Sequence, residues 1–172
     1  MSSVQLKVQV KGVKEALRQM NKVDPKLRRQ FTKRYKDIVK PVIQDAKARF
    51  PNEPPLSGMG KPYKKLGGWD GGLVAKGVVA KINTRKARNR NVAKGAVYET
   101  VGAFIIQQKT GWGSLYDMAG KKRPGSKMNQ ALVQEGFGSA SRAMWPAYEK
   151  NQTKIDAAVK DLVNDVMKDF WR

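Results

Sequence analysis

The chain has 172 residues, with 35 Lys and Arg against 14 Asp and Glu, so its formal net charge is +21. It has no His and no Cys, which excludes disulfides, cysteine nucleophiles, histidine bases and zinc sites built on either residue. The excess of positive charge is uneven, because residues 71–134 contain 12 basic residues and only two acidic ones. Such an excess indicates an acidic partner, either nucleic acid or an acidic protein surface.

The N-terminal part predicts one strand and two helices. Apolar and polar residues alternate over residues 4–10, which is typical of a half-buried strand, and residues 13–23 have helical spacing. Asp24 followed by Pro25 marks the start of a long amphipathic helix that Pro51 closes. Pro41 lies inside this pattern and predicts a kink near residues 37–40.

The middle of the chain predicts two strands between long loops. Strands are expected at residues 73–83 and 96–108, as a hairpin or as strands that are not neighbours. Glycine, proline and basic residues predict loops at about 51–72, 84–95 and 109–130.

The C-terminal part predicts a short helical stretch within residues 131–144 and then a long amphipathic helix that begins at Pro146. Together the elements predict an α+β fold in one domain over residues 1–172. A small antiparallel sheet is packed by the long helix of the N-terminal half and by the C-terminal helix. No apolar run is long enough to span a bilayer, and the N-terminus lacks the apolar core of a signal peptide, so we expect a cytoplasmic chain.

The carboxylates do not form a convincing catalytic motif. Asp45 and Lys47 have the spacing of the acid–x–lysine end of a nuclease motif, but that motif belongs on a strand and this pair lies on an expected helix. Asp70, Glu99 and Asp117 are scattered. We therefore expect no enzyme activity, no metal and no cofactor, and a carboxylate-metal nuclease is the least favoured hypothesis.

A basic segment in the expected loop at 84–95 is the sharpest local signal. It indicates sequence-independent contact with DNA phosphates, contact with an acidic protein, or a solvated loop tip. Its residues are Arg85, Lys86, Arg88, Arg90 and Lys94.

Three tryptophans lie in or beside Gly/Pro-rich segments, and each is a candidate for the core or for a subunit interface. The two interpretations are equally favoured for Trp112, the core is favoured for Trp145, and Trp69 is kept as an interface candidate.

The order of several short motifs resembles the neck, or tail-component, family of long-tailed bacteriophages, whose small proteins join head to tail. In that family a Gly-x-x-x-Leu helix start follows the first strand, and the long helix ends in Ala-x-x-x-x-Pro. In this chain the corresponding Gly12 and Leu17 have four residues between them. An aromatic–acid–x–x–Gly motif precedes a basic loop, and a Pro-Ala pair opens the last helix. The segments that carry this resemblance are Val8–Leu17, Asp45–Pro51, Pro55–Gly58, Leu115–Lys121 and Arg142–Tyr148.

The resemblance implies a structural virion protein, assembled in the host cytoplasm, that forms a six- or twelve-fold ring between portal and tail tube. Its partners are further copies of itself and neighbouring connector, stopper and tail proteins, with double-stranded DNA in the lumen as an open alternative and no membrane. The expected subunit-interface residues are Trp69, Trp112, Tyr116, Lys121, Lys122 and Arg123.

Two departures from the family pattern leave the layer of the neck open. Asp117 stands where Glu is commoner, and residues 83–97 are unusually basic. The chain could form any of four parts of the neck: the neck ring, the stopper, the tail terminator or the tail-completion protein. A free, sequence-independent DNA-binding protein is the alternative from another class.

Overall fold

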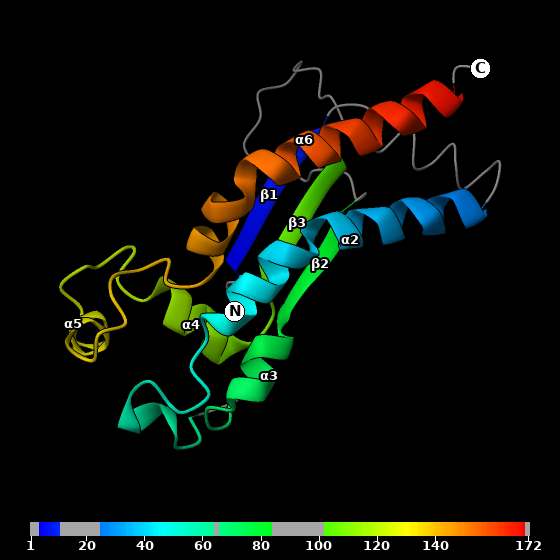
Figure 1. Cartoon of the computed structure of the whole chain (residues 1–172). Helices are drawn as coiled ribbons and strands as arrows, with labels where there is room; N and C mark the ends of the chain where they lie inside the picture. The colour runs from blue at the N-terminus through cyan, green and yellow to red at the C-terminus, as the bar shows by residue number, and fades with distance from the viewer. Residues whose placement is uncertain (1–3, 11–24, 64–65, 84–101, 171–172) are drawn as a thin grey trace, which may run out of the picture. The chain divides into compact units, whose positions relative to one another are not determined.

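The computed structural model describes residues 4–10, 25–63, 66–83 and 102–170, and it confirms the α+β class (Figure 1). Its elements, in chain order, are β1 (Val4–Val10), α2 (Pro25–Ala48), the short 3-10 helix η1 (Ser57–Met59), α3 (Gly71–Lys76), β2 (Val78–Asn83), β3 (Gly102–Gln108), α4 (Gly111–Met118), α5 (Lys127–Gln134) and α6 (Met144–Phe170). The expected helix at 13–23 and the loop at 84–95 lie outside the described residues.

The three strands form one small antiparallel sheet in the order β1-β3-β2. The backbone N–H of Lys109 donates to the carbonyl of Gly77 at 3.0 Å, so the end of β3 lies beside the start of β2. This is the antiparallel register of neighbouring strands, which confirms the pairing expected for these two strands.

The described residues form two compact units that are interleaved along the chain. The first unit comprises residues 4–6, 40–63, 66–80 and 106–152, and the second comprises 7–10, 25–39, 81–83, 102–105 and 153–170. The division leaves a single domain over residues 1–172 as a prediction. It falls just before Pro41, and the kink expected there also stays a prediction.

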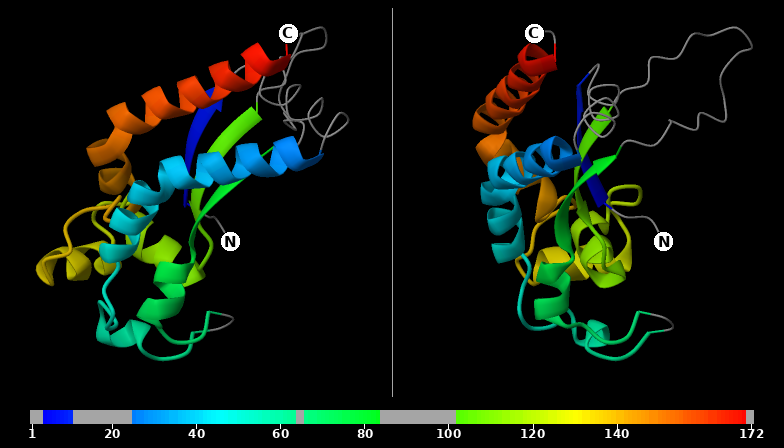
Figure 2. Two further views of the ribbon diagram at one scale, coloured as in Figure 1. Left: turned by 45° about the vertical axis from the view of Figure 1, so that its right-hand side comes forward. Right: turned by 90° about the vertical axis from the view of Figure 1, so that its right-hand side faces the viewer.

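In the second unit, parts of α2 and α6 cover the same face of the strands (Figure 2). Phe31 and Tyr35 of α2 and Leu162 of α6 are buried, as their helical spacing predicts. The Tyr35 hydroxyl donates to the carbonyl of Ile105 in β3 at 3.3 Å, and burial raises the pKa of this hydroxyl far above its usual range. Tyr35 therefore remains a hydrogen-bond donor that ties α2 to the sheet.

Two sequence predictions about local structure are wrong. Residues 73–83 are expected to form one strand, but the strand begins only at Val78, after the short helix α3. Asp70 caps this helix, because its side chain accepts a hydrogen bond from the backbone N–H of Leu73 at 2.8 Å. The cap and the burial of Val74 outweigh the β-propensity of this segment.

The prediction of a loop at residues 109–130 is also wrong, because this segment contains α4 and the start of α5. Thr110 and Ser126 cap these helices by accepting from the N–H groups of Gly113 and Asn129. Gly113 is required for packing: a Cβ there would lie 2.5 Å from Nε2 of the buried Gln108. The glycines of this segment thus allow a helix to pack closely, although their number predicts a loop.

The long C-terminal helix is confirmed, and α6 places Pro146 in its first turn, where no backbone N–H is needed. The short helical stretch expected within residues 131–144 is confirmed only at its start, because α5 spans residues 127–134. Gly136 and Gly138 follow α5 with φ of 83° and 72°, in the left-handed region that favours glycine. None of the helices described has an apolar stretch long enough to cross a membrane.

Replacing Asp70 with alanine should lower the free energy of unfolding by about 1 kcal/mol, because α3 loses the acceptor for one of its first N–H groups. Chemical denaturation measures this, with the exposed Glu53→Ala as the matched control. Equal effects of the two substitutions would show that the cap contributes nothing.

Candidate functional site

The start of α6 is capped by a side chain from a distant helix. Asp117, in the last turn of α4, accepts hydrogen bonds at Oδ1 from the backbone N–H groups of Ala143 at 2.6 Å and Met144 at 3.2 Å. These are N–H groups that a helix start leaves without internal partners. The acid of the aromatic–acid–x–x–Gly motif therefore joins α4 to α6.

Arg142 makes the opposite connection, from the start of α6 back to the end of α4. Its NH1 donates to the carbonyls of Tyr116 at 2.7 Å and Ala119 at 2.9 Å, and its NH2 donates to Oδ1 of Asn129 in α5 at 2.8 Å. We call Asp117, Asn129 and Arg142 the Asp117–Arg142 cluster. All three residues are buried, so the cluster is an internal junction of α4, α5 and α6.

Gly120 is needed for this junction. Its φ of 98° is unfavourable for any residue with a side chain, and a Cβ at this position would collide with the side chain of Asn129. Asn129 in turn donates from Nδ2 to the carbonyl of Pro124 at 2.6 Å. The glycine of the motif thus leaves room for the asparagine that Arg142 binds.

The electrostatics of the cluster are dominated by burial. Burial raises the pKa of the Asp117 carboxyl, and this effect exceeds the opposing stabilisation by the N–H groups of Ala143 and Met144 and by Arg142. Burial likewise raises the pKa of Tyr116, against the attraction of Arg142, whose guanidinium lies 5.8 Å from the ring centre. Among the residues that the structure describes, neither Asp117 Oδ2 nor Arg142 Nε has a hydrogen-bond partner, so these two buried groups are incompletely satisfied there.

This predicts a pH dependence of stability. The folded state holds the Asp117 proton more tightly than the unfolded chain does, so this group's contribution to the free energy of unfolding is present at low pH. It falls as pH rises from about 4, the ordinary Asp value, through the raised pKa. Urea denaturation over a pH series, compared between the native chain and Asp117→Asn, should show the difference between them change over that interval. A difference that is constant with pH would contradict the prediction.

Three of the expected interface residues belong to the core of the first unit. Tyr116 has ring contacts with Phe50, Trp69 and Phe137 at centroid distances of 5.7 to 5.8 Å. The indole N–H groups of Trp69 and Trp112 donate to the carbonyls of Pro51 and Gly67. Trp69, Trp112 and Tyr116 are at most 9% exposed, so assigning them to a subunit interface is wrong: internal packing already occupies these side chains.

The prediction for Trp145 is also wrong, because the sequence favours the core for this residue, whereas its side chain is 47% exposed. Its indole N–H donates to Oε1 of Glu149 one turn later at 2.6 Å, and its ring lies 5.6 Å from that of Tyr148. The first turn of α6 buries Met144 and Ala147 instead, so helical geometry turns Trp145 outward.

The remaining sequence candidates are only partly described. Lys121, Lys122 and Arg123 are exposed, so they stay available to a partner. The basic segment Arg85, Lys86, Arg88, Arg90 and Lys94 lies outside the described residues. The structure therefore leaves untested which partner that segment contacts.

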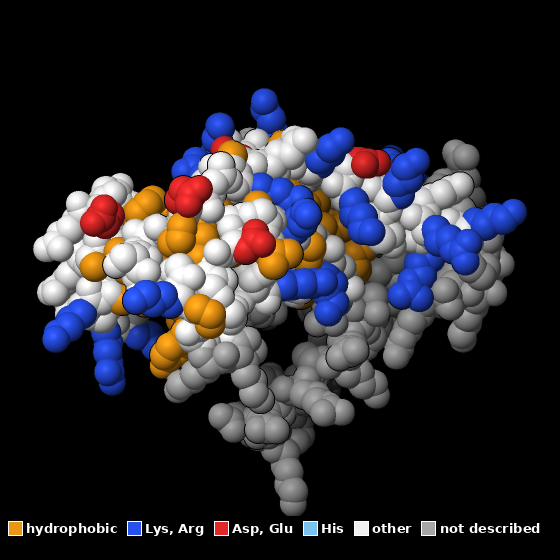
Figure 3. Space-filling view, turned by 90° about the horizontal axis from the view of Figure 1, so that it is seen from below, with side chains coloured by type: hydrophobic (Ala, Val, Ile, Leu, Met, Phe, Trp, Pro, Cys, Tyr) orange, Lys and Arg blue, Asp and Glu red, His pale blue; other side chains and the backbone are white. Residues whose placement is uncertain are grey.

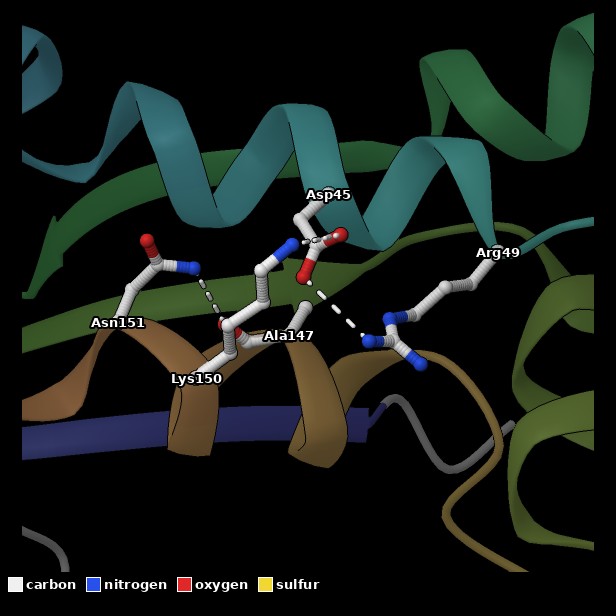
Figure 4. Close-up of polar contacts among 5 residues, drawn as sticks. All are labelled: Asp45, Arg49, Ala147, Lys150 and Asn151. Carbon is white, nitrogen blue, oxygen red and sulfur yellow. Dashed lines mark hydrogen bonds and ion pairs between the residues drawn. The ribbon is translucent and has the colours of Figure 1, made fainter.

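Asp45, the acid of the nuclease-like pair, is held by two cations (Figure 4). Its carboxylate oxygens lie 3.5 Å from Arg49 NH2 on the next turn and 3.5 Å from Lys150 Nζ on α6. Asn151, the residue after Lys150, donates from its side chain to the carbonyl of Ala147 within α6. The pair with Lys47 lies on a helix, as the sequence predicts, and Asp45 serves as a bridge between two helices.

No group of three or more carboxylates that could hold a metal ion occurs in the described ranges. Comparisons of this chain with protein-family models, with curated proteins and with solved structures give no match.

Sequence reasoning missed the role of Arg142 and Asn129. Arg142 stands in the segment that opens the last helix, and a basic residue just before a helix start is unfavourable for the helix dipole unless it is bound elsewhere. That conflict is the one local signal that could have singled it out.

Proposed function

We propose that the chain is a structural protein of the head-to-tail joint of a long-tailed bacteriophage, and that copies of it form a ring around the DNA path. The observation that carries the proposal is the Asp117–Arg142 cluster. It brings together Leu115–Lys121 and Arg142–Tyr148, two of the segments on which the resemblance to the neck family rests. Two short motifs that are far apart in the sequence support the resemblance more strongly when their side chains bind each other in the fold than when they are unconnected.

A cyclic ring needs two different complementary patches on each subunit. The first unit offers two kinds of exposed group. Trp145 is an exposed aromatic of the type enriched in interfaces, and Lys121, Lys122 and Arg123 form an exposed basic loop. We assign the apolar side of the contact to Trp145, in place of the buried aromatics, and the charged side to this loop.

The proposal assigns no catalytic step to the chain, and it places the protein in the virion. The layer stays open among neck ring, stopper, tail terminator and tail-completion protein. A sixfold or twelvefold ring is the expected stoichiometry.

The test is the mass of the assembly. Native mass spectrometry and negative-stain electron microscopy of the purified chain should show a closed ring, and Trp145→Ser should reduce it to monomers without changing the circular dichroism spectrum. The control is Leu73→Ser, which changes another exposed apolar side chain of the same unit. A chain that stays monomeric at all concentrations and does not occur in phage particles would remove the proposal.

A further inference from the structure

The first half of α2 is a strongly basic helix. Residues 25–36 contain six Lys and Arg and no Asp or Glu. Three of them, Arg29, Lys33 and Lys36, are spaced by four and three residues, so they share one face of the helix. We call these three residues the α2 stripe. Lys26 lies three residues before it on the same face.

The α2 stripe faces solvent. All three side chains are exposed, whereas Phe31, Tyr35 and Val39 on another face of the same helix are buried. Within the described ranges, none of the three has an ion pair or a hydrogen bond from its side chain. Lys and Arg side chains gather in the part of the surface seen in Figure 3 where α2 begins, with few acidic side chains among them.

Arg34, which neighbours the α2 stripe in sequence, differs from the stripe residues because it has an ion-pair partner. Arg34 of α2 lies away from the stripe and pairs with Asp165 of α6 at 2.7 Å. The part of α6 in this unit, residues 153–170, has three Lys and four Asp. Among the described residues of the second unit, the excess of positive charge is therefore concentrated on α2, whereas Asp residues balance the Lys residues on α6.

The chemistry of the stripe favours a nucleic acid over a protein partner. Protein interfaces have an apolar or aromatic centre, but none of the exposed large apolar side chains of the described residues lies on α2. Successive stripe residues are about 4.5 to 6 Å apart along the helix axis, from the rise of 1.5 Å per residue. A row of cations without base-reading side chains suits phosphate groups in any sequence.

We propose that the α2 stripe binds the phosphate backbone of double-stranded DNA independently of base sequence. The binding belongs to the chain itself and does not require the ring of the proposed function. The α2 stripe is a separate surface from the basic segment at residues 85–94, whose partner stays a prediction.

The test measures duplex DNA binding by fluorescence anisotropy from about 50 to about 200 mM salt. The triple variant Arg29→Gln, Lys33→Gln and Lys36→Gln should bind more weakly. The slope of log affinity against log salt concentration should decrease in magnitude by up to about 2.7, because each lost phosphate contact reduces that slope by about 0.9. Circular dichroism and thermal unfolding should stay unchanged, since the three side chains are exposed.

The matched control is Lys154→Gln, Lys160→Gln and Lys168→Gln, which removes the same charge from exposed sites on α6. It should keep most of the affinity and the slope. Equal losses in both triple variants would show that only net charge matters and would overturn the proposal. The proposal would also be overturned if the stripe variant kept the salt dependence of the native chain and only a third variant, Arg85→Gln, Arg88→Gln and Arg90→Gln, reduced it.

Poly-L-glutamate serves as the acidic-protein probe. The native chain should prefer DNA at equal charge concentration. Equal affinity for both polyanions, with equal losses in the stripe variant, would make the stripe a general anion surface and would also overturn the assignment to DNA. The oligomeric state is measured in parallel, so failure of DNA binding and failure of ring formation are separate results.

Discussion

Replacing Arg142 with alanine should lower the free energy of unfolding by about 3–5 kcal/mol. The guanidinium donates to three acceptors, the carbonyls of Tyr116 and Ala119 and Oδ1 of Asn129, and all three lose their donor at once. The buried carboxylate of Asp117 also loses its nearby positive charge. Urea denaturation monitored by the fluorescence of the tryptophans measures the change.

The control is Arg123→Ala, which removes an exposed arginine from the same unit and should change stability by less than about 0.5 kcal/mol. Arg142→Lys should recover only part of the loss, because one Nζ cannot reproduce the forked geometry of the guanidinium. If Arg142→Ala is no worse than Arg123→Ala, the Asp117–Arg142 cluster does not hold α4, α5 and α6 together.

Replacing Phe31 with alanine should cost about 3–5 kcal/mol. Phe31 is 3% exposed and belongs to the buried face of α2, so the substitution leaves a cavity in the core of the second unit. Leu162→Ala, on the other helix of the same core and 1% exposed, should cost about 2–5 kcal/mol. Thermal and urea unfolding measure both effects.

Gln30→Ala is the control for Phe31, since it changes the neighbouring, exposed residue of the same helix. It should leave stability within about 0.5 kcal/mol of the native chain. A loss below about 1 kcal/mol for Phe31→Ala would mean that this face of α2 is not packed as described.

The helices with a clear period were predictable from the sequence. In α2, Phe31, Tyr35, Val39, Val42 and Ala46 follow at spacings of three and four, and all are buried. α6 has the same pattern through Ile155, Val159 and Leu162. Periodicity succeeds here because a long amphipathic helix has one face to bury, whatever it packs against.

The short helices were not predictable from composition. α3 and α4 begin with glycines, and glycine is a poor helix former. Their side-chain caps, Asp70 and Thr110, and the close packing of Gly113 on Gln108 stabilise them instead. The effect of a cap depends on a few atoms in one geometry, which residue counts over a window do not capture.

The candidate site was predicted only in part. Asp117 and Gly120 belong to a motif that the sequence singled out, but their partners Arg142 and Asn129 lie 9 to 25 residues away and carried no assigned role. The exposure of the tryptophans was unpredictable for the same reason. Trp69 and Trp112 are buried by segments distant in sequence, while Trp145 is turned outward by the register of α6.

The sequence by itself determined the charge of +21, the exclusion of histidine and cysteine chemistry, and the buried faces of the two long helices. These depend on composition or on residues within one or two turns. Only the tertiary structure decided the strand order β1-β3-β2, the junction of Asp117 with Arg142, and which aromatics remain exposed. These depend on which distant segments meet, because a buried polar group or ring is stable only where a partner from elsewhere in the chain surrounds it.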